Sequence, residues 1–157
     1  MLINYYGANI LLNKAVEGLT VIMIEEIIFD DIVYAIVIKG DYDKKGISFV
    51  TPDNYSQQVA YMNHESGHRI QPHYHNQIER TVFYTQEVLI IKQGKLRADF
   101  YNKERKKLGE RVLNEGDLIL LCYGGHGFEV IEEVKMIEIK QGPYVGEQDK
   151  TRFEPLI

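Results

Sequence analysis

Two histidines, His73 and His75, lie one residue apart directly after a proline in the stretch GHRIQPHYHNQIER. On a strand, side chains two residues apart project from the same face about 7 Å apart, so two such imidazoles can face one ion. Divalent transition metals at sites of this kind take three or four ligands, usually imidazoles with a carboxylate. The pattern therefore indicates half of a metal site, and the rest of the chain must supply the other half.

Three further side chains are candidates for that other half. Glu79 follows His75 with three residues between them, and Glu87 heads the apolar run VLIIKQG. His126 comes much later, after a pair of glycines in the stretch CYGGHG. The chain thus offers three histidines and a choice of two carboxylates.

The remaining histidines and the single cysteine have plainer interpretations. His64 and His68 flank a turn in NHESGHR, and we expect them to be exposed. Cys122 lies near the expected site, but no neighbouring base or cation would form the thiolate, so we expect a buried, inert thiol. With one cysteine, an intramolecular disulfide and a thiolate metal cluster are both excluded.

The segments that must position these residues read as short β-branched and aromatic runs separated by turns. Helical periodicity is weak, and residues 8–18 fit either a helical turn or an irregular lead-in. In residues 95–101, Leu96, Ala98 and Phe100 alternate with polar residues, as expected for a strand with one buried face. The expected strands are 19–29, 31–40, 46–50, 55–63, 69–80, 81–94, 95–102, 109–121, 127–134 and 135–142.

Composition and charge narrow the class of protein. The 157 residues suit one domain, and the net charge of −5 argues against nucleic acid as a partner. Four carboxylates interrupt the apolar residues 19–40, which excludes a membrane helix there. The first residues lack the features of a signal peptide, so we expect a soluble, cytoplasmic protein.

The spacing of the candidate ligands resembles that of the cupin superfamily. The first cupin motif is a glycine, five residues, His-x-His, a short gap, a glutamate, six residues and a glycine. Gly67, His73 and His75 match its first part, and Glu87 with Gly94 matches its last part. Glu79 instead keeps the family's spacing from His75, so both carboxylates remain candidates and Glu87 is favoured.

The second cupin motif is a glycine, five residues, proline, one residue, glycine, two residues and a histidine. Gly116 and Gly124 match it, Cys122 replaces the proline, and one residue rather than two precedes His126. The resemblance covers residues 67–130. It implies that His73, His75, Glu87 and His126 hold a divalent transition metal such as iron, manganese, nickel or zinc.

The resemblance also implies the fold. We expect an all-β, single-domain double-stranded β-helix, the cupin-like jelly-roll barrel, with additional N-terminal strands. Residues 1–57 would complete the sheets or form a dimer edge, and residues 58–142 would form the core barrel. Residues 143–157 would form a C-terminal tail that either wraps the body as an ordered coil or simply ends it. A homodimer paired through the N-terminal strands is expected, although covering an edge within one subunit would explain these strands equally well.

A small-molecule enzyme of dioxygenase or isomerase type is the leading functional hypothesis. Its substrate would be small and polar, such as a sugar derivative or keto-acid, with Arg80 or Lys140 facing an anionic group. Glu79, Arg80 and Tyr84 are the candidate catalytic residues. The alternatives are a non-catalytic metabolite-binding or sensory module and a metal-independent sugar epimerase. In the epimerase, His73 or His75 would be the base beside the Glu79 carboxylate, and Tyr84 would be the acid.

Overall fold

The computed structural model describes the backbone of residues 2–5, 8–16 and 19–156, and the side chains of residues 23–156. These residues form ten β-strands and one three-residue 3-10 helix, η1 (Gly146–Gln148), with no α-helix among them. Nor does this described part contain a helix that is long and apolar enough to cross a membrane. The strands are β1 (Leu2–Tyr5), β2 (Ala8–Val16), β3 (Leu19–Phe29), β4 (Ile32–Ile38), β5 (Gly46–Phe49), β6 (Ala60–Asn63), β7 (Glu87–Tyr101), β8 (Lys107–Asn114), β9 (Leu118–Leu121) and β10 (Gly125–Lys140).

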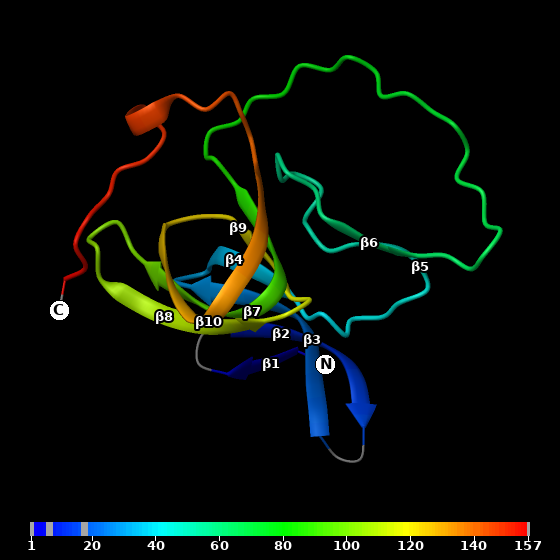
Figure 1. Ribbon diagram of the computed structural model, residues 1–157, viewed down its shortest axis with the longest axis horizontal. Coiled ribbons are helices and arrows are strands. Elements are labelled where there is room, and N and C mark those ends of the chain that lie inside the picture. Colours follow the sequence, from blue (N-terminus) through cyan, green and yellow to red (C-terminus); the bar gives the residue numbers. More distant parts are fainter. Residues whose placement is uncertain (1, 6–7, 17–18, 157) are drawn as a thin grey trace. The chain divides into compact units, whose positions relative to one another are not determined.

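The chain divides into two compact units, and each is described by itself. The larger unit, Met1–Tyr42 with Tyr84–Ile157, contains a curled antiparallel sheet (Figure 1). Its strand order is β1-β2-β3-β4-β9-β7-β10, and β8 also pairs with β7. The smaller unit, Asp43–Phe83, contains the β5–β6 hairpin and a long segment without strand pairing. The expected all-β class is therefore confirmed.

The β3–β4 hairpin shows how local sequence sets this topology. Asp30 and Asp31 both have positive φ angles, 49° and 60°, which is the backbone of a two-residue type I′ turn. Aspartate tolerates this region better than most residues because its short side chain can bond locally. The expected meeting of two strands at Asp30–Asp31 is confirmed.

A sharp corner divides the long antiparallel ribbon of β7 and β10. Gly94 has a φ of +82°, and a Cβ there would lie 1.9 Å from the carbonyl oxygen of Glu133. The β10 register shifts between Val130 and Met136, opposite this glycine. Only glycine fits, because the two backbones touch where the ribbon turns.

On its other edge, β7 pairs with a different strand on each side of this corner. Residues 87–90 pair with β9 and residues 95–101 pair with β8, so β8 and β9 lie end to end along β7. The buried carboxylate of Asp117 joins these parts: it accepts hydrogen bonds from the backbone N–H groups of Gly40 and Asn114, both at 2.9 Å, and from the Lys39 ammonium. This carboxylate therefore fixes the end of β4 to the β8–β9 turn.

Apolar side chains fill the concave face of the curled sheet. Leu89 and Ile91 face it before the corner, and Leu96, Ala98 and Phe100 face it after the corner, all at most 1% exposed. The inward-facing positions are odd-numbered before the corner and even-numbered after it. One residue at the corner is therefore outside the regular two-residue alternation. The buried face expected for Leu96, Ala98 and Phe100 is confirmed. Residues 119–121 of β9 are buried as well.

Some expected elements differ from those observed. Residues 8–16 form strand β2 rather than a helical turn or irregular lead-in, because they pair with β3; Glu17 and Gly18 lie outside the described residues. The strand expected at 69–80 is wrong: this segment is exposed and pairs with no strand among the described residues. The expected strands 81–94 and 95–102 merge into β7, which begins only at Glu87. The expected strands 127–134 and 135–142 merge into β10, which begins at Gly125 and ends at Lys140.

The packing predicts that truncating two side chains directly opposite each other on β7 and β10 should change the free energy of unfolding by very different amounts. Leu96 is 0% exposed, whereas Val130, opposite it on β10, is 57% exposed. Leu96→Ala should lower the free energy of unfolding by about 2–5 kcal/mol through the cavity it creates. Val130→Ala should cost under about 1 kcal/mol. Urea denaturation measures both, and equal losses would contradict this assignment of the core.

Candidate functional site

Glu87 and His126 meet on the concave side of the larger unit, although they are 39 residues apart in the sequence. Glu87 begins β7 and shares its face with Leu89, whereas His126 lies opposite Phe100 near the start of β10. In a flat ribbon the positions of Glu87 and Phe100 would be roughly 40 Å apart. The corner folds the ribbon back and brings His126 Nε2 to 3.2 Å from Glu87 Oε2.

The contact between these two side chains is a hydrogen bond in which the imidazole donates to the carboxylate. Their side chains are 29% and 12% exposed for His126 and Glu87, so the pair is sheltered but still reached by solvent. The hydrogen bond from His126 lowers the pKa of Glu87, partial burial opposes this, and the positive charges of Lys140 and Lys150 reinforce the lowering. Glu87 is therefore an ionised carboxylate at neutral pH.

Lys140 extends the pair into a cluster of charges. It lies opposite Glu87 in the β7–β10 register, with its Nζ 3.8 Å from Glu87 Oε1. The same ammonium lies 3.3 Å from Glu138 and 3.6 Å from Asp149. Both Glu138 and Lys140 thus project from the concave face, and three carboxylates surround one cation.

His73 and His75 lie close together in the smaller unit. Their ring centroids are 5.3 Å apart, and His73 donates a hydrogen bond from Nδ1 to the carbonyl oxygen of Gln71 at 2.9 Å. Such a bond leaves Nε2 as the acceptor nitrogen, which is the usual arrangement of a metal-binding histidine. Glu79 and Arg80 are exposed in the same unpaired segment.

The predicted ligands therefore form two pairs, one in each unit. The structure brings Glu87 to His126 and His73 to His75, and the set of four remains a prediction from the sequence motifs. Within residues 23–156, whose side chains are described, no three histidine, cysteine, aspartate or glutamate residues are placed to hold an ion. Glu87 contacts one predicted histidine ligand, His126, whereas Glu79 is exposed in the unpaired segment of the smaller unit.

Two other candidate residues, Tyr84 and Cys122, pack against their neighbours in the larger unit. Tyr84 packs edge-on against Tyr123, which in turn packs edge-on against Tyr34, with centroid distances of 5.6 and 5.5 Å. Cys122 is 7% exposed, and its thiol contacts the carbonyl oxygen of Leu120 at 3.7 Å. The expectation of a buried thiol is thus confirmed.

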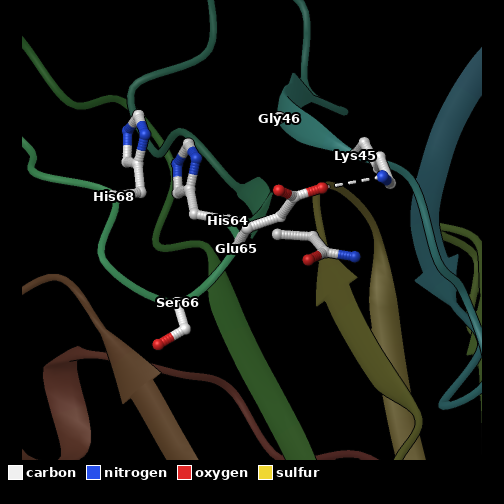
Figure 2. A pocket seen from close by; sticks show the side chains of 7 residues that line it. Lys45, Gly46, His64, Glu65, Ser66 and His68 are labelled. Carbon is white, nitrogen blue, oxygen red and sulfur yellow. Dashed lines mark hydrogen bonds and ion pairs between the residues drawn. The ribbon is translucent and has the colours of Figure 1, made fainter.

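His64 and His68 are not simply two exposed residues of a turn, as the sequence suggested. Their rings are stacked with centroids 4.1 Å apart, and they line a pocket with Lys45 and Glu65 (Figure 2). His64 is only half-exposed, and its Nε2 is buried. The spacing of these residues is the signal that was missed, because two histidines four residues apart are close neighbours on either a helix or a tight turn.

That segment also spells His-Glu-x-x-His, a zinc motif when it lies on a helix. Here it lies on a turn: Gly67 has a φ of +85°, and the His68 N–H donates to the Glu65 carbonyl oxygen at 3.1 Å. The Glu65 carboxylate points toward Lys45, 2.9 Å away, rather than toward the imidazoles (Figure 2). The helical zinc arrangement is therefore not formed.

Comparison with known protein families, curated proteins and solved structures finds no match to this chain. The geometry of the Glu87–His126 pair and the spacing of the sequence motifs are thus the grounds for a functional proposal.

The lowered pKa of Glu87 predicts a pH-dependent contribution to stability. A glutamate in an unfolded chain titrates near about pH 4.3. Because folding lowers this pKa, the ionised carboxylate stabilises the fold above that pH, and the contribution is lost as the pH falls through the folded-state pKa. The unfolding free energies of wild type and Glu87→Gln should therefore differ most near neutral pH and converge as the pH falls below the lowered pKa of Glu87.

Urea denaturation in the presence of a chelator measures that difference at each pH. Glu115→Gln, which removes one exposed turn carboxylate, controls for the change in net charge. A wild-type advantage over Glu87→Gln that grows on acidification would contradict the assignment.

Proposed function

We propose that this protein is a divalent-metal-binding cupin with a jelly-roll barrel fold, acting on a small polar substrate. The observation that carries the proposal is the 3.2 Å contact between Glu87 and His126. Glu87 is the carboxylate that the first cupin motif assigns and His126 is the histidine that the second motif assigns, and they come from separate parts of the chain. His73 and His75 are the other two ligands that the first motif assigns.

The Glu87–His126 pair suits a metal ion in distance and in chemistry. With metal–nitrogen and metal–oxygen bonds of about 2.1 Å, two neighbouring ligand atoms of one ion lie roughly 3.0–3.4 Å apart. The observed separation of Nε2 and Oε2, 3.2 Å, falls in that range. An imidazole with an ionised carboxylate is also the donor set preferred by iron, manganese, nickel and zinc.

A bound metal would supply Lewis-acid or redox chemistry to an oxygen-rich substrate such as a sugar derivative or keto-acid. The protein's own residues would hold and orient that substrate. Lys140 is a cation on the same face as Glu87 and His126, 3.8 Å from Glu87, and can face an anionic group. Dioxygenase and isomerase reactions are the two reaction types proposed.

Metal analysis of protein purified without chelators tests the ligand set. Wild type should carry about one equivalent of a transition metal, and Glu87→Gln, His126→Ala and the double variant His73→Ala/His75→Ala should each lose more than roughly tenfold in affinity. The double variant His64→Ala/His68→Ala removes two histidines elsewhere and should retain the metal. Equal metal content in all these proteins would refute the site.

The same contact also favours a second candidate function. A histidine hydrogen-bonded to a partly buried carboxylate is the arrangement of a general base, in which the carboxylate orients and stabilises the imidazole. His126 with Glu87 would then abstract a proton next to a carbonyl, as a metal-independent epimerase does. In this reading the dyad is His126–Glu87 rather than His73 or His75 with Glu79.

Proton exchange in deuterated water separates the two functions. A panel of keto-acids and sugar phosphates, followed by proton NMR, should reveal loss of the signal next to the carbonyl. Metal-dependent exchange should stop in chelator and return with manganese or iron. Exchange by the dyad should persist in chelator and fall by about 10²–10⁴ in His126→Gln.

A further inference from the structure

Strand β10 is an edge strand: among the residues that the structure describes, it pairs with β7 and with no other strand. Residues directly opposite each other in an antiparallel pair point to the same face of the sheet. Three apolar residues of β10 lie opposite core residues of β7: Phe128 opposite Ala98, Val130 opposite Leu96 and Met136 opposite Ile91. These three side chains, which we call the apolar row, therefore face the concave side of the sheet.

The apolar row is exposed, although it points to the same face as the core. Phe128 is 39% exposed, Val130 57% and Met136 42%, whereas their partners on β7 are at most 1% exposed. The core thus covers the concave face of β7 and leaves that of β10 open. Exposed apolar side chains that gather on one concave surface are typical of sites that bury part of a ligand.

The apolar row begins at the candidate site. His126 comes two residues before Phe128 on the same face, and the centroids of their rings are 5.4 Å apart. Val130 comes two residues further along, so this arm of the row extends roughly 13 Å from His126. The Phe128 ring is therefore the apolar neighbour of any ligand held at Glu87 and His126.

Polar and apolar groups divide the concave face of β10 between them. Glu138 and Lys140 project from this face beyond Met136, and Lys140 lies 3.8 Å from Glu87. The apolar row itself offers no strong hydrogen-bonding group. A hydroxyl placed against it would lose hydrogen bonds to water without replacement, whereas burial of a methylene would be favourable. The surroundings of the site thus match a ligand that is polar at one end and apolar at the other.

We propose that Phe128, with Val130 and Met136, selects a substrate that carries an apolar group beside its polar reacting end. The polar end of this substrate lies at Glu87 and His126, and its apolar group lies on the apolar row. Of the two proposed substrate classes, a keto-acid with an apolar side chain is therefore favoured over a sugar derivative, which carries hydroxyls around its ring. The inference rests on the proposed function in taking Glu87 and His126 as the site.

Binding of n-butanol, n-hexanol and the hexanediol with a hydroxyl at each end tests the apolar row. Carbon–proton NMR of the metal-free protein measures it. Hexanol should shift the methyl signals of Val130 and Met136 together with the ring signals of His126. Affinity should rise about fourfold for each methylene between butanol and hexanol. Hexanediol should bind several-fold more weakly than hexanol, because its second hydroxyl would lie against apolar side chains.

Ile139→Ala is the matched control for Phe128→Ala. Ile139 also lies on β10 and is 48% exposed, but it alternates with Glu138 and Lys140 and so points to the opposite face. Ile139→Ala should bind hexanol as wild type does, whereas Phe128→Ala should bind it several-fold more weakly. Val130→Thr, which keeps the shape of the side chain and adds a hydroxyl, should also weaken binding. Circular dichroism confirms that each variant is folded.

Equal hexanol affinity in Phe128→Ala and Ile139→Ala, or equal affinities of hexanol and hexanediol for wild type, would overturn the inference. Sedimentation velocity supplies a further test. A dimer that Phe128→Ala dissociates and Ile139→Ala does not would also overturn it, because a second copy of the chain would then cover the apolar row. Since these experiments use metal-free protein, their failure is distinct from a failure of the metal analysis that tests the proposed function.

Discussion

The bend of the β7–β10 ribbon is the constraint on which the rest of the larger unit depends. At Gly94 the two backbones approach so closely that no side chain fits between them. The same bend closes the apolar face over Leu89 and Phe100 and folds the two ends of the ribbon together. Core and candidate site are thus products of one backbone feature, and a larger residue at position 94 would disturb both.

The charges at the site follow from that geometry. Glu87 begins the ribbon and Lys140 ends it, so their register places them side by side, while the fold-back adds His126 from the opposite end. Asp149 then joins from the segment beyond β10. Four residues from three separate parts of the chain therefore share one small volume, which is sheltered enough for their charges to influence one another.

Local patterns predicted the elements better than they predicted how these elements combine. Alternation identified the buried face of Leu96 and Phe100, and the Asp30–Asp31 turn was readable because its chemistry is local. The strand expected around His73 failed because β-branched and aromatic content describes only a tendency, whereas a strand needs a partner. The motif spacing selected Glu87 and His126. Their contact depends on the bend at Gly94, however, and a single glycine does not predict such a bend from sequence.

The loss of one step in the alternation at the corner has a consequence for how this chain tolerates length changes. Before Gly94 the inward positions are odd-numbered, and after it they are even-numbered. Deleting or inserting a single residue between Ile91 and Leu96 would therefore turn one arm of the ribbon inside out, moving Phe100 out of the apolar core and pointing Asp99 into it. Natural variation in length should be confined to the loops, and the spacing across this corner should be kept.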